Sequence, residues 1–300
     1  MTALVEEFEA QRPRLFGLAY RLLGSAAEAE DAVQDAYLRL HTADRSGIES
    51  LRAWLTKVVT NLCLNRLTST RARRESYVGP WLPEPVITGD GTLGPLETAE
   101  QRDSVSIALL TLMERLSPGE RAAFVLREAF GYSHQEIAEM LETSDTNARQ
   151  LHHRARQQLG EPTPRFRPDP AQWHDLVEQF LTASRRGDVA GLVTMLTAEV
   201  TSVADDGGKV SAARRPVTSR DRVARYLARG LSRPAAAVRL DFAEVNGEPA
   251  VLGFTGPTLA GVLFFQTDGD RIAALRIVAN PEKLRFVANQ LSHTAGLSGP

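Results

Sequence analysis

Hydrogen-bond donors recur at helical spacing in one stretch of the sequence, GYSHQEIAEMLETSDTNARQLHHRARQQL (131–159). At 100° per residue, Ala148, Leu151, Ala155 and Leu159 share one side of its second half, which suits packing. The opposite side presents side chains that can reach base edges and phosphates. These are Thr146, Arg149, Gln150, His153 and Gln157, with Arg156 at the edge. The pattern favours DNA recognition over the alternative, an amphipathic helical hairpin with a solvated polar face.

Two helices must position this donor face. Ser133 followed by Glu136 is a capping box, which predicts a first helix over Ser133–Leu141. A tight turn at Glu142–Ser144 and a second helix to about Leu159 complete the geometry of a helix-turn-helix.

A second chemical signal is the distribution of charge. The chain has a formal net charge of −2, but residues 1–44 carry −4, residues 45–74 carry +6 and residues 75–120 carry −6. An acidic surface beside a basic one indicates two partners, a positively charged protein and a nucleic acid. Scattered solvated charge is the alternative interpretation.

Helices are predicted for most of the first 160 residues. In the first segment, about 3–74, Ser25 followed by Glu28 is a capping box that opens a helix to about His41, and Ser50 can cap another helix. The stretch YVGPWLPEPVITGDGTLGPLE holds four prolines and four glycines in 21 residues, which excludes a packed helix pair. A second helical unit begins near residue 103 and includes the capping box opened by Ser117.

The pattern changes after about residue 171. Helical stretches precede four strand-like runs, AVRLDFAEV, AVLGFTG, LAGVLFFQT and RIAALRIVA. Asn246-Gly247 and Asp268-Gly269 are hairpin-turn pairs, and Asn280-Pro281 opens a last short helix. The order predicts an α+β domain with a curved antiparallel sheet covered by helices.

Composition restricts the class of protein. Apolar residues make up 43% of the chain and charged residues 24%, values of an ordinary folded protein. The sequence favours a cytoplasmic protein without a membrane span for three reasons. Cys63 is the single cysteine, the N-terminus does not resemble a signal peptide, and the longest apolar run, near Leu259–Phe265, is too short to cross a bilayer. We expect no cofactor and no metal, because the adjacent His152 and His153 diverge by about 100° and lack further ligands.

Residues 5–160 resemble extracytoplasmic-function (ECF) sigma factors. The stretches 134–139 (HQEIAE) and 153–156 (HRAR) are similar to their C-terminal DNA-reading domain. Residues 29–38 (AEDAVQDAYL) resemble the helix that docks on the polymerase clamp. Leu51–Leu55, with Asn61 and Arg66 beyond, resembles the part that melts and reads the −10 element.

The resemblance implies a role for each set of side chains. Acceptors on one exposed helix would pair with clamp arginines: Glu30, Asp31, Gln34 and Asp35. Side chains on the basic helix would hold an unstacked base and neutralise phosphates: Lys57, Asn61, Asn65 and Arg66. Sequence-independent phosphate contacts would come from Arg71, Arg73 and Arg74. Trp54 is at least as suited to core packing as to base stacking.

The tail resembles a SnoaL-like domain of the NTF2-like cone fold, and the chain resembles sigma factors that carry this domain fused, the SigJ type. Three motifs support this: Gly79–Pro85 in the linker, Asp205–Val210 and Asn280–Leu284. The run of glycines in the second motif is one residue shorter than in that type. The expected domains are sigma domain 2 (1–74), a linker (75–102), sigma domain 4 (103–162) and the SnoaL-like domain (171–291). The expected regulatory contacts join Trp81, Leu82, Asp206, Lys209, Asn280 and Lys283.

The function implied is promoter-specific initiation, with regulation in cis by the tail. The partners would be promoter DNA and the polymerase core, through its β′ clamp and β flap. The free protein would be a monomer and not an enzyme.

Two alternative functions stay open. SnoaL-like folds include enzymes with an Asp or His in an apolar cone, for which Asp205 and Asp206 are candidates and Asp241 and Glu244 weaker ones. The tail could also sense a ligand in an ordinary transcription regulator.

Overall fold

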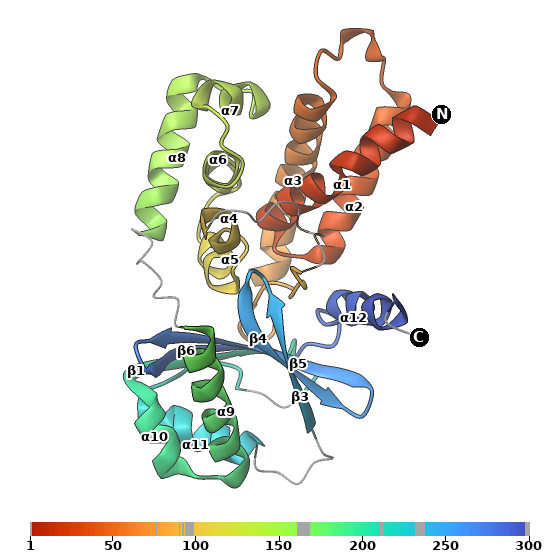
Figure 1. Cartoon of the computed structure of the whole chain (residues 1–300). Coiled ribbons are helices and arrows are strands. Elements are labelled where there is room, and N and C mark those ends of the chain that lie inside the picture. Colours follow the sequence, from red (N-terminus) through yellow and green to blue (C-terminus); the bar gives the residue numbers. More distant parts are fainter. Residues whose placement is uncertain are drawn as a thin grey trace. The chain divides into compact units, whose positions relative to one another are not determined.

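A computed structural model describes residues 2–75, 77–89, 91, 93, 99–160, 169–210, 213–231 and 238–297. The chain forms two compact units (Figure 1). The first contains Met1–Ser76, Pro83–Glu161 and Val245–Glu248, and the second contains Tyr77–Leu82, Pro162–Glu244 and Pro249–Pro300. The predicted linker is therefore divided between the units, because Tyr77–Leu82 belong to the second unit and its other residues to the first.

The first unit begins with three long helices, α1 (Thr2–Leu23), α2 (Ala26–Thr42) and α3 (Leu51–Glu75), with a 3-10 turn η1 (Arg45–Gly47) before α3. Ser25 caps α2, since its hydroxyl accepts from the backbone N of Glu28 at 3.2 Å. Ser50 Oγ accepts from Ala53 N at 3.3 Å at the start of α3. The three helices pack through fully buried side chains such as Leu15, Val33 and Val59. The helical prediction for this segment is confirmed.

Five shorter helices follow in the same unit: α4 (Ala99–Asp103), α5 (Ile107–Met113), α6 (Pro118–Glu128), α7 (His134–Met140) and α8 (Asp145–Leu159). The predicted capping boxes at Ser117 with Glu120 and at Ser133 with Glu136 form. Between α7 and α8 the backbone turns at Glu142, whose φ is 52°. The helix-turn-helix is therefore present with the predicted turn.

The second unit is built on a six-stranded sheet of order β2-β1-β6-β5-β4-β3. Its helices α9 (Pro170–Arg186), α10 (Val189–Met195) and α11 (Arg220–Leu231) pack on one face, and α12 (Arg285–Leu297) ends the described chain. The strands are β1 (Leu196–Asp205), β2 (Val217–Thr218), β3 (Val238–Val245), β4 (Glu248–Thr255), β5 (Thr258–Asp268) and β6 (Arg271–Val278).

The sheet differs from the prediction in one respect, because it is mixed and not antiparallel. β1 pairs with β6 in parallel, with Ser202 opposite Leu275. The sequence did not predict β1 as a strand, since Glu199 and Asp205 interrupt its apolar pattern. The last helix is also longer than predicted: Asn280 opens a turn, and α12 starts five residues later at Arg285.

The α+β core lies between α9–α11 and the sheet. Trp173, Phe180 and Phe265 pack there with aliphatic side chains from every one of these elements. The Trp173 indole donates to the Phe265 carbonyl at 3.5 Å. At the β3–β4 turn, Asn246 and Gly247 have φ of 56° and 69°, which the predicted type of hairpin turn requires.

Candidate DNA-reading surfaces and the linker-binding cluster

The predicted donor face lies on the exposed side of α8. Its side chains Thr146, Arg149, Gln150, His153 and Arg156 are all exposed, while Ala148 and Ala155 on the opposite side are fully buried. Ser144 caps the helix by accepting from Asn147 N at 3.2 Å. Arg149 Nε lies 2.9 Å from Asp145 Oδ2, an exposed pair of low energy that leaves the guanidinium able to turn toward a ligand.

The second predicted DNA surface lies on α3. Asn65 is exposed, and Lys57, Asn61 and Arg66 are half-buried. Lys57 Nζ lies 3.1 Å from Glu142 Oε1, in the turn of the helix-turn-helix. The predicted phosphate-binding residues Arg71, Arg73 and Arg74 belong to α3, but their side chains are not among those that the structure describes.

The predicted polymerase-binding face lies on α2. Glu30, Asp31 and Gln34 are exposed and Asp35 is half-buried. Arg66 of the predicted DNA surface lies 2.6 Å from Asp35 and 3.7 Å from Asp31. Two residue sets that the sequence assigned to different partners therefore meet in one ion-pair network.

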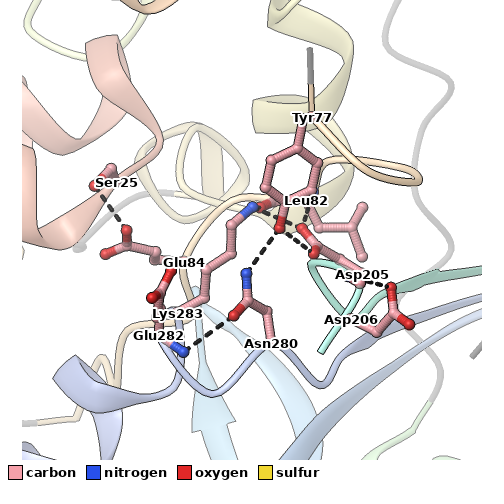
Figure 2. Close-up of polar contacts among 10 residues, drawn as sticks. Ser25, Tyr77, Leu82, Glu84, Asp205, Asp206, Asn280, Glu282 and Lys283 are labelled. Carbon is pink, nitrogen blue, oxygen red and sulfur yellow. Dashed lines mark hydrogen bonds and ion pairs between the residues drawn. The ribbon is translucent and has the colours of Figure 1, made fainter. Parts of the chain in front are cut away.

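In the second unit, a buried ion pair surrounds the backbone of the linker (Figure 2). Asp205 is completely buried, and its Oδ2 accepts from Lys283 Nζ at 2.6 Å and from Leu82 N at 2.7 Å. Lys283 Nζ also donates to the Leu82 carbonyl at 2.5 Å. The pair therefore binds both backbone groups of Leu82, whose side chain is only 1% exposed.

The aromatic residues of the linker complete this cluster. The Tyr77 hydroxyl donates to Asp205 Oδ1 at 2.6 Å and accepts from Asn280 Nδ2 at 2.8 Å. Lys283 Nζ lies 4.2 Å from the centroid of the Trp81 ring, within cation–π range. Burial, followed by the hydrogen bond to Asp205, raises the pKa of Tyr77, so its hydroxyl stays a donor. We call Tyr77 of the linker, together with Asp205, Asn280 and Lys283 of the C-terminal domain, the linker-binding cluster.

The predicted regulatory residues divide into those inside and those beside this cluster. Asn280 and Lys283 contact the linker, as do Trp81 and Leu82 from the linker itself. Asp206 instead shapes the neighbouring turn, since its Oδ1 accepts from Gly208 N at 3.1 Å. Lys209 is exposed and pairs with Glu282.

Tyr77 and Asp205 are the members of the linker-binding cluster that sequence reasoning missed. The sequence indicates Asp205 only as the first residue of the Asp205–Val210 motif and as a catalytic candidate, because the two glycines that follow soon after it are typical of a turn. Its position at the buried end of β1 depends on the parallel pairing with β6, opposite Val278. If β1 is predicted as a strand, Asp205 becomes its last residue and is no longer part of the turn that follows.

The remainder of the described linker belongs to the first unit. The Glu84 carboxylate accepts from Ser25 Oγ and from Ala26 N, both at 2.8 Å, at the start of α2. The Glu84 backbone N donates to the Gly24 carbonyl at 2.9 Å. A carboxylate at the N-terminus of a helix is stabilised by unpaired N–H groups and by the helix dipole.

Asn246 is a further contact of the linker that the sequence predicted only as a turn residue. It is fully buried in the first unit, and its Nδ2 donates to Tyr20 Oη at 2.6 Å and to the Val105 carbonyl at 2.7 Å. Its Oδ1 accepts from Val86 N at 3.0 Å, and its own N donates to Val86 O at 2.9 Å. A single amide side chain therefore joins the linker to α1 and to the chain before α5.

The catalytic alternative finds little support in these positions. Asp205 is engaged by Lys283, Leu82 and Tyr77, and Asp206 bonds its own turn. Asp241 pairs with Arg239 at the surface of β3. The buried carboxylates among the described residues are Glu120, Asp205 and Asp206.

No group of three or more metal-binding side chains occurs in the described ranges. His152 instead lies 2.7 Å from Glu128 and 3.4 Å from His134. Within the same ranges, no helix has the length and hydropathy needed to span a membrane.

Two family models match the chain, Sigma-70 region 2 over residues 8–73 and Sigma-70, region 4 over residues 106–159. The chain is 38% identical over 292 residues to "ECF RNA polymerase sigma factor SigJ" of Mycobacterium tuberculosis, which covers 93% of this chain and 92% of that protein. It is 34% identical over 282 residues to "Probable ECF RNA polymerase sigma factor SigI" of the same species, over 92% of this chain and 93% of that one.

The crystal structure of the Mycobacterium tuberculosis extracytoplasmic function sigma factor SigJ has the same fold. It matches with a TM-score of 0.72 at 35% identity, over 93% of this chain and 98% of that one. The likeness includes the C-terminal α+β region as well as the helical domains.

Proposed function

This chain belongs to the ECF RNA polymerase sigma factors, and we propose that its C-terminal SnoaL-like domain regulates it in cis by holding the linker between the two sigma domains. Sigma factors bind core RNA polymerase and promoter DNA and direct initiation. The proposal adds the means by which this chain would control that activity.

One observation carries the proposal: the buried Asp205–Lys283 pair binds both the N–H and the C=O of Leu82. A buried ion pair is costly to form unless further hydrogen bonds satisfy its atoms. Here the linker backbone supplies those bonds. Releasing the linker would leave the two charges without these partners, so the bound state is favoured.

Holding the linker affects promoter recognition through geometry. Two DNA-reading domains joined by a free linker can adjust their separation to the two promoter elements. A linker segment bound to a third domain removes that freedom. The SnoaL-like domain would then act as an inhibitor within the same chain.

We also propose that the surfaces of α8, α3 and α2 have the roles that the resemblance implied. The proposed domain limits are 1–74, 75–102, 103–162 and 171–291. The α8 face would read the −35 element and bind near the β flap, α3 would read the −10 element, and the α2 face would dock on the β′ clamp. The free protein would be a monomer. The Arg66 pairs with Asp31 and Asp35 support a role for Arg66 in ordering the α2 face as well.

The test compares Lys283→Met with Lys209→Met in the full-length protein. Lys283→Met removes the charge that binds Leu82 O, whereas Lys209→Met removes an exposed lysine of a neighbouring turn that pairs with Glu282. We expect faster proteolysis within residues 77–88 and higher promoter-specific transcription for Lys283→Met only. If Lys283→Met matches the parent protein in both assays, the linker is not held by this pair and the proposal fails.

A further inference from the structure

A strongly basic segment lies in the second unit, in residues that are not part of the linker-binding cluster. The described residues 213–231 contain six arginines and one acidic residue, Asp221. This is a local concentration of positive charge in a chain whose formal net charge is −2. Neither the helix-turn-helix nor the linker-binding cluster uses these arginines.

The geometry of α11 gathers three of them on one side. Val223, Ala224, Leu227 and Ala228 are buried and face the domain core. At 100° per residue, the exposed side chains of Arg222, Arg225 and Arg229 fall within an arc of roughly 60° on the opposite side. We call these three residues the arginine face. They span about 10 Å along the helix axis, from a rise of 1.5 Å per residue.

Two more exposed arginines, Arg214 and Arg215, belong to the segment beside α11. Ala213 N donates to the Tyr226 hydroxyl at 3.2 Å, which places the start of that segment against the helix. Among the described residues, no carboxylate forms an ion pair with Arg214, Arg215 or the arginine face. Their charges are therefore available to an anionic partner.

We propose that the arginine face binds the phosphate backbone of duplex DNA upstream of the −35 element. Guanidinium groups match phosphate oxygens in a two-point geometry and keep their charge at all physiological pH values. A duplex presents one negative charge per about 1.7 Å of axis, so a helix face about 10 Å long can meet several phosphates. Such contacts add affinity without adding sequence preference.

The length of chain between α8 and α9 favours DNA over an acidic protein as the partner. α8 ends at Leu159 and α9 begins at Pro170. Eleven peptide steps reach at most about 40 Å when fully extended. The inference rests on the proposed placement of α8 at the −35 element, because the arginine face is then tethered close to the same duplex. Tethering raises its local concentration, so weak phosphate contacts become effective.

The duplex on the other side of the −35 element leads to the −10 element, which the proposal assigns to α3 and the polymerase. The upstream duplex is therefore the segment open to the arginine face.

Each phosphate contact that releases a counterion steepens the dependence of log K on log salt by about 0.9, where K is the binding constant for DNA.

The experiment uses holoenzyme reconstituted with full-length protein, and compares the parent with R222Q/R225Q/R229Q. Promoter affinity is measured against KCl concentration on two fragments, one with about 20 extra base pairs upstream of the −35 element and one ending at its edge. On the long fragment we expect the variant to bind about tenfold more weakly at low salt and to lose about 2–3 from the salt slope. On the short fragment the two proteins should be equal.

Two controls separate charge from fold and position. R222K/R225K/R229K keeps the positive charge and should retain most of the slope on the long fragment. Arg271→Gln removes one exposed arginine at the start of β6 and should leave the slope unchanged.

Three results would overturn the inference: equal slopes for parent and R222Q/R225Q/R229Q on the long fragment, an equal loss on both fragments, or weaker binding of the variant to core polymerase without DNA. The last would identify an acidic protein surface as the partner. A wrong −35 assignment would appear separately, as a parent holoenzyme whose affinity ignores scrambling of that element.

Discussion

At the level of single residues, the contacts of the linker depend on a few buried side chains that each make several hydrogen bonds. Asp205, Lys283 and Asn246 are all buried, and each bonds linker backbone groups. Backbone recognition of this kind fixes the position of a segment with little dependence on its side chains. Removal of any one of these side chains leaves buried polar groups without a hydrogen-bond partner, which lowers the free energy of unfolding.

Asn246 gives the most direct prediction at this scale. Asn246→Ala removes bonds to Tyr20, Val105 and Val86, and it also places alanine at a φ of 56°. We expect a loss of about 2–4 kcal/mol in the free energy of unfolding, measured by urea denaturation.

Asn246→Gly separates the two causes of that loss. Glycine tolerates the positive φ but makes no side-chain bonds, so most of the loss should remain. The exposed Asn65→Ala serves as the matched control, with an expected change under about 0.5 kcal/mol. A stable Asn246→Gly protein would show that the amide bonds of Asn246 contribute little.

At the level of elements, α8 combines a buried side that docks on its own domain with an exposed side of donors. Arg149 lies on the exposed side and pairs with Asp145 in the same helix. We expect Arg149→Ala to weaken the dependence on the −35 element by about 1–3 kcal/mol if it contacts a base, measured as transcription from promoters with intact and scrambled elements. Equal dependence in the parent and the variant would remove Arg149 from the reading surface.

The acidic face of α2 gives a second prediction for an element. Reversing charge at Asp31 and Asp35 should abolish assembly with core polymerase, measured by co-purification, because clamp arginines would meet lysines. Glu6→Lys with Glu7→Lys makes the same charge change on the exposed side of α1 and should assemble normally.

Arg66 must be controlled for in that experiment, because it pairs with both carboxylates. Arg66→Gln breaks the same ion pairs but leaves the acidic face negative. If it loses assembly to the same extent, the effect of the double reversal comes from the network within the chain and not from the clamp.

How far the sequence predicts each element depends on where its signals lie. α7 and α8 are bounded by local signals, namely capping serines and a turn, and they appear as predicted. β1 has no such signal, because its place in the sheet comes from parallel pairing with β6, far along the chain. The mixed sheet and the burial of Asp205 follow from that pairing and were missed with it.

At the level of the whole molecule, the linker motif and the two C-terminal motifs were predicted to act together, but not the side chains that connect them. The motifs include Lys283 and Asn280 of the linker-binding cluster, but they do not indicate that Tyr77 and Asp205 complete it. Sequence spacing relates neighbours along the chain, and Asp205 and Leu82 are 123 positions apart. Only the fold brings such residues together.

Hydrogen exchange at the Leu82 amide tests most directly whether the C-terminal domain holds the linker in solution. That amide donates to a completely buried carboxylate, so in the full-length protein its exchange should be strongly slowed. Lys283→Met should speed the exchange by at least about tenfold, while Lys209→Met leaves it unchanged. A Leu82 amide that exchanges in the parent protein as fast as in an unstructured peptide would contradict the account.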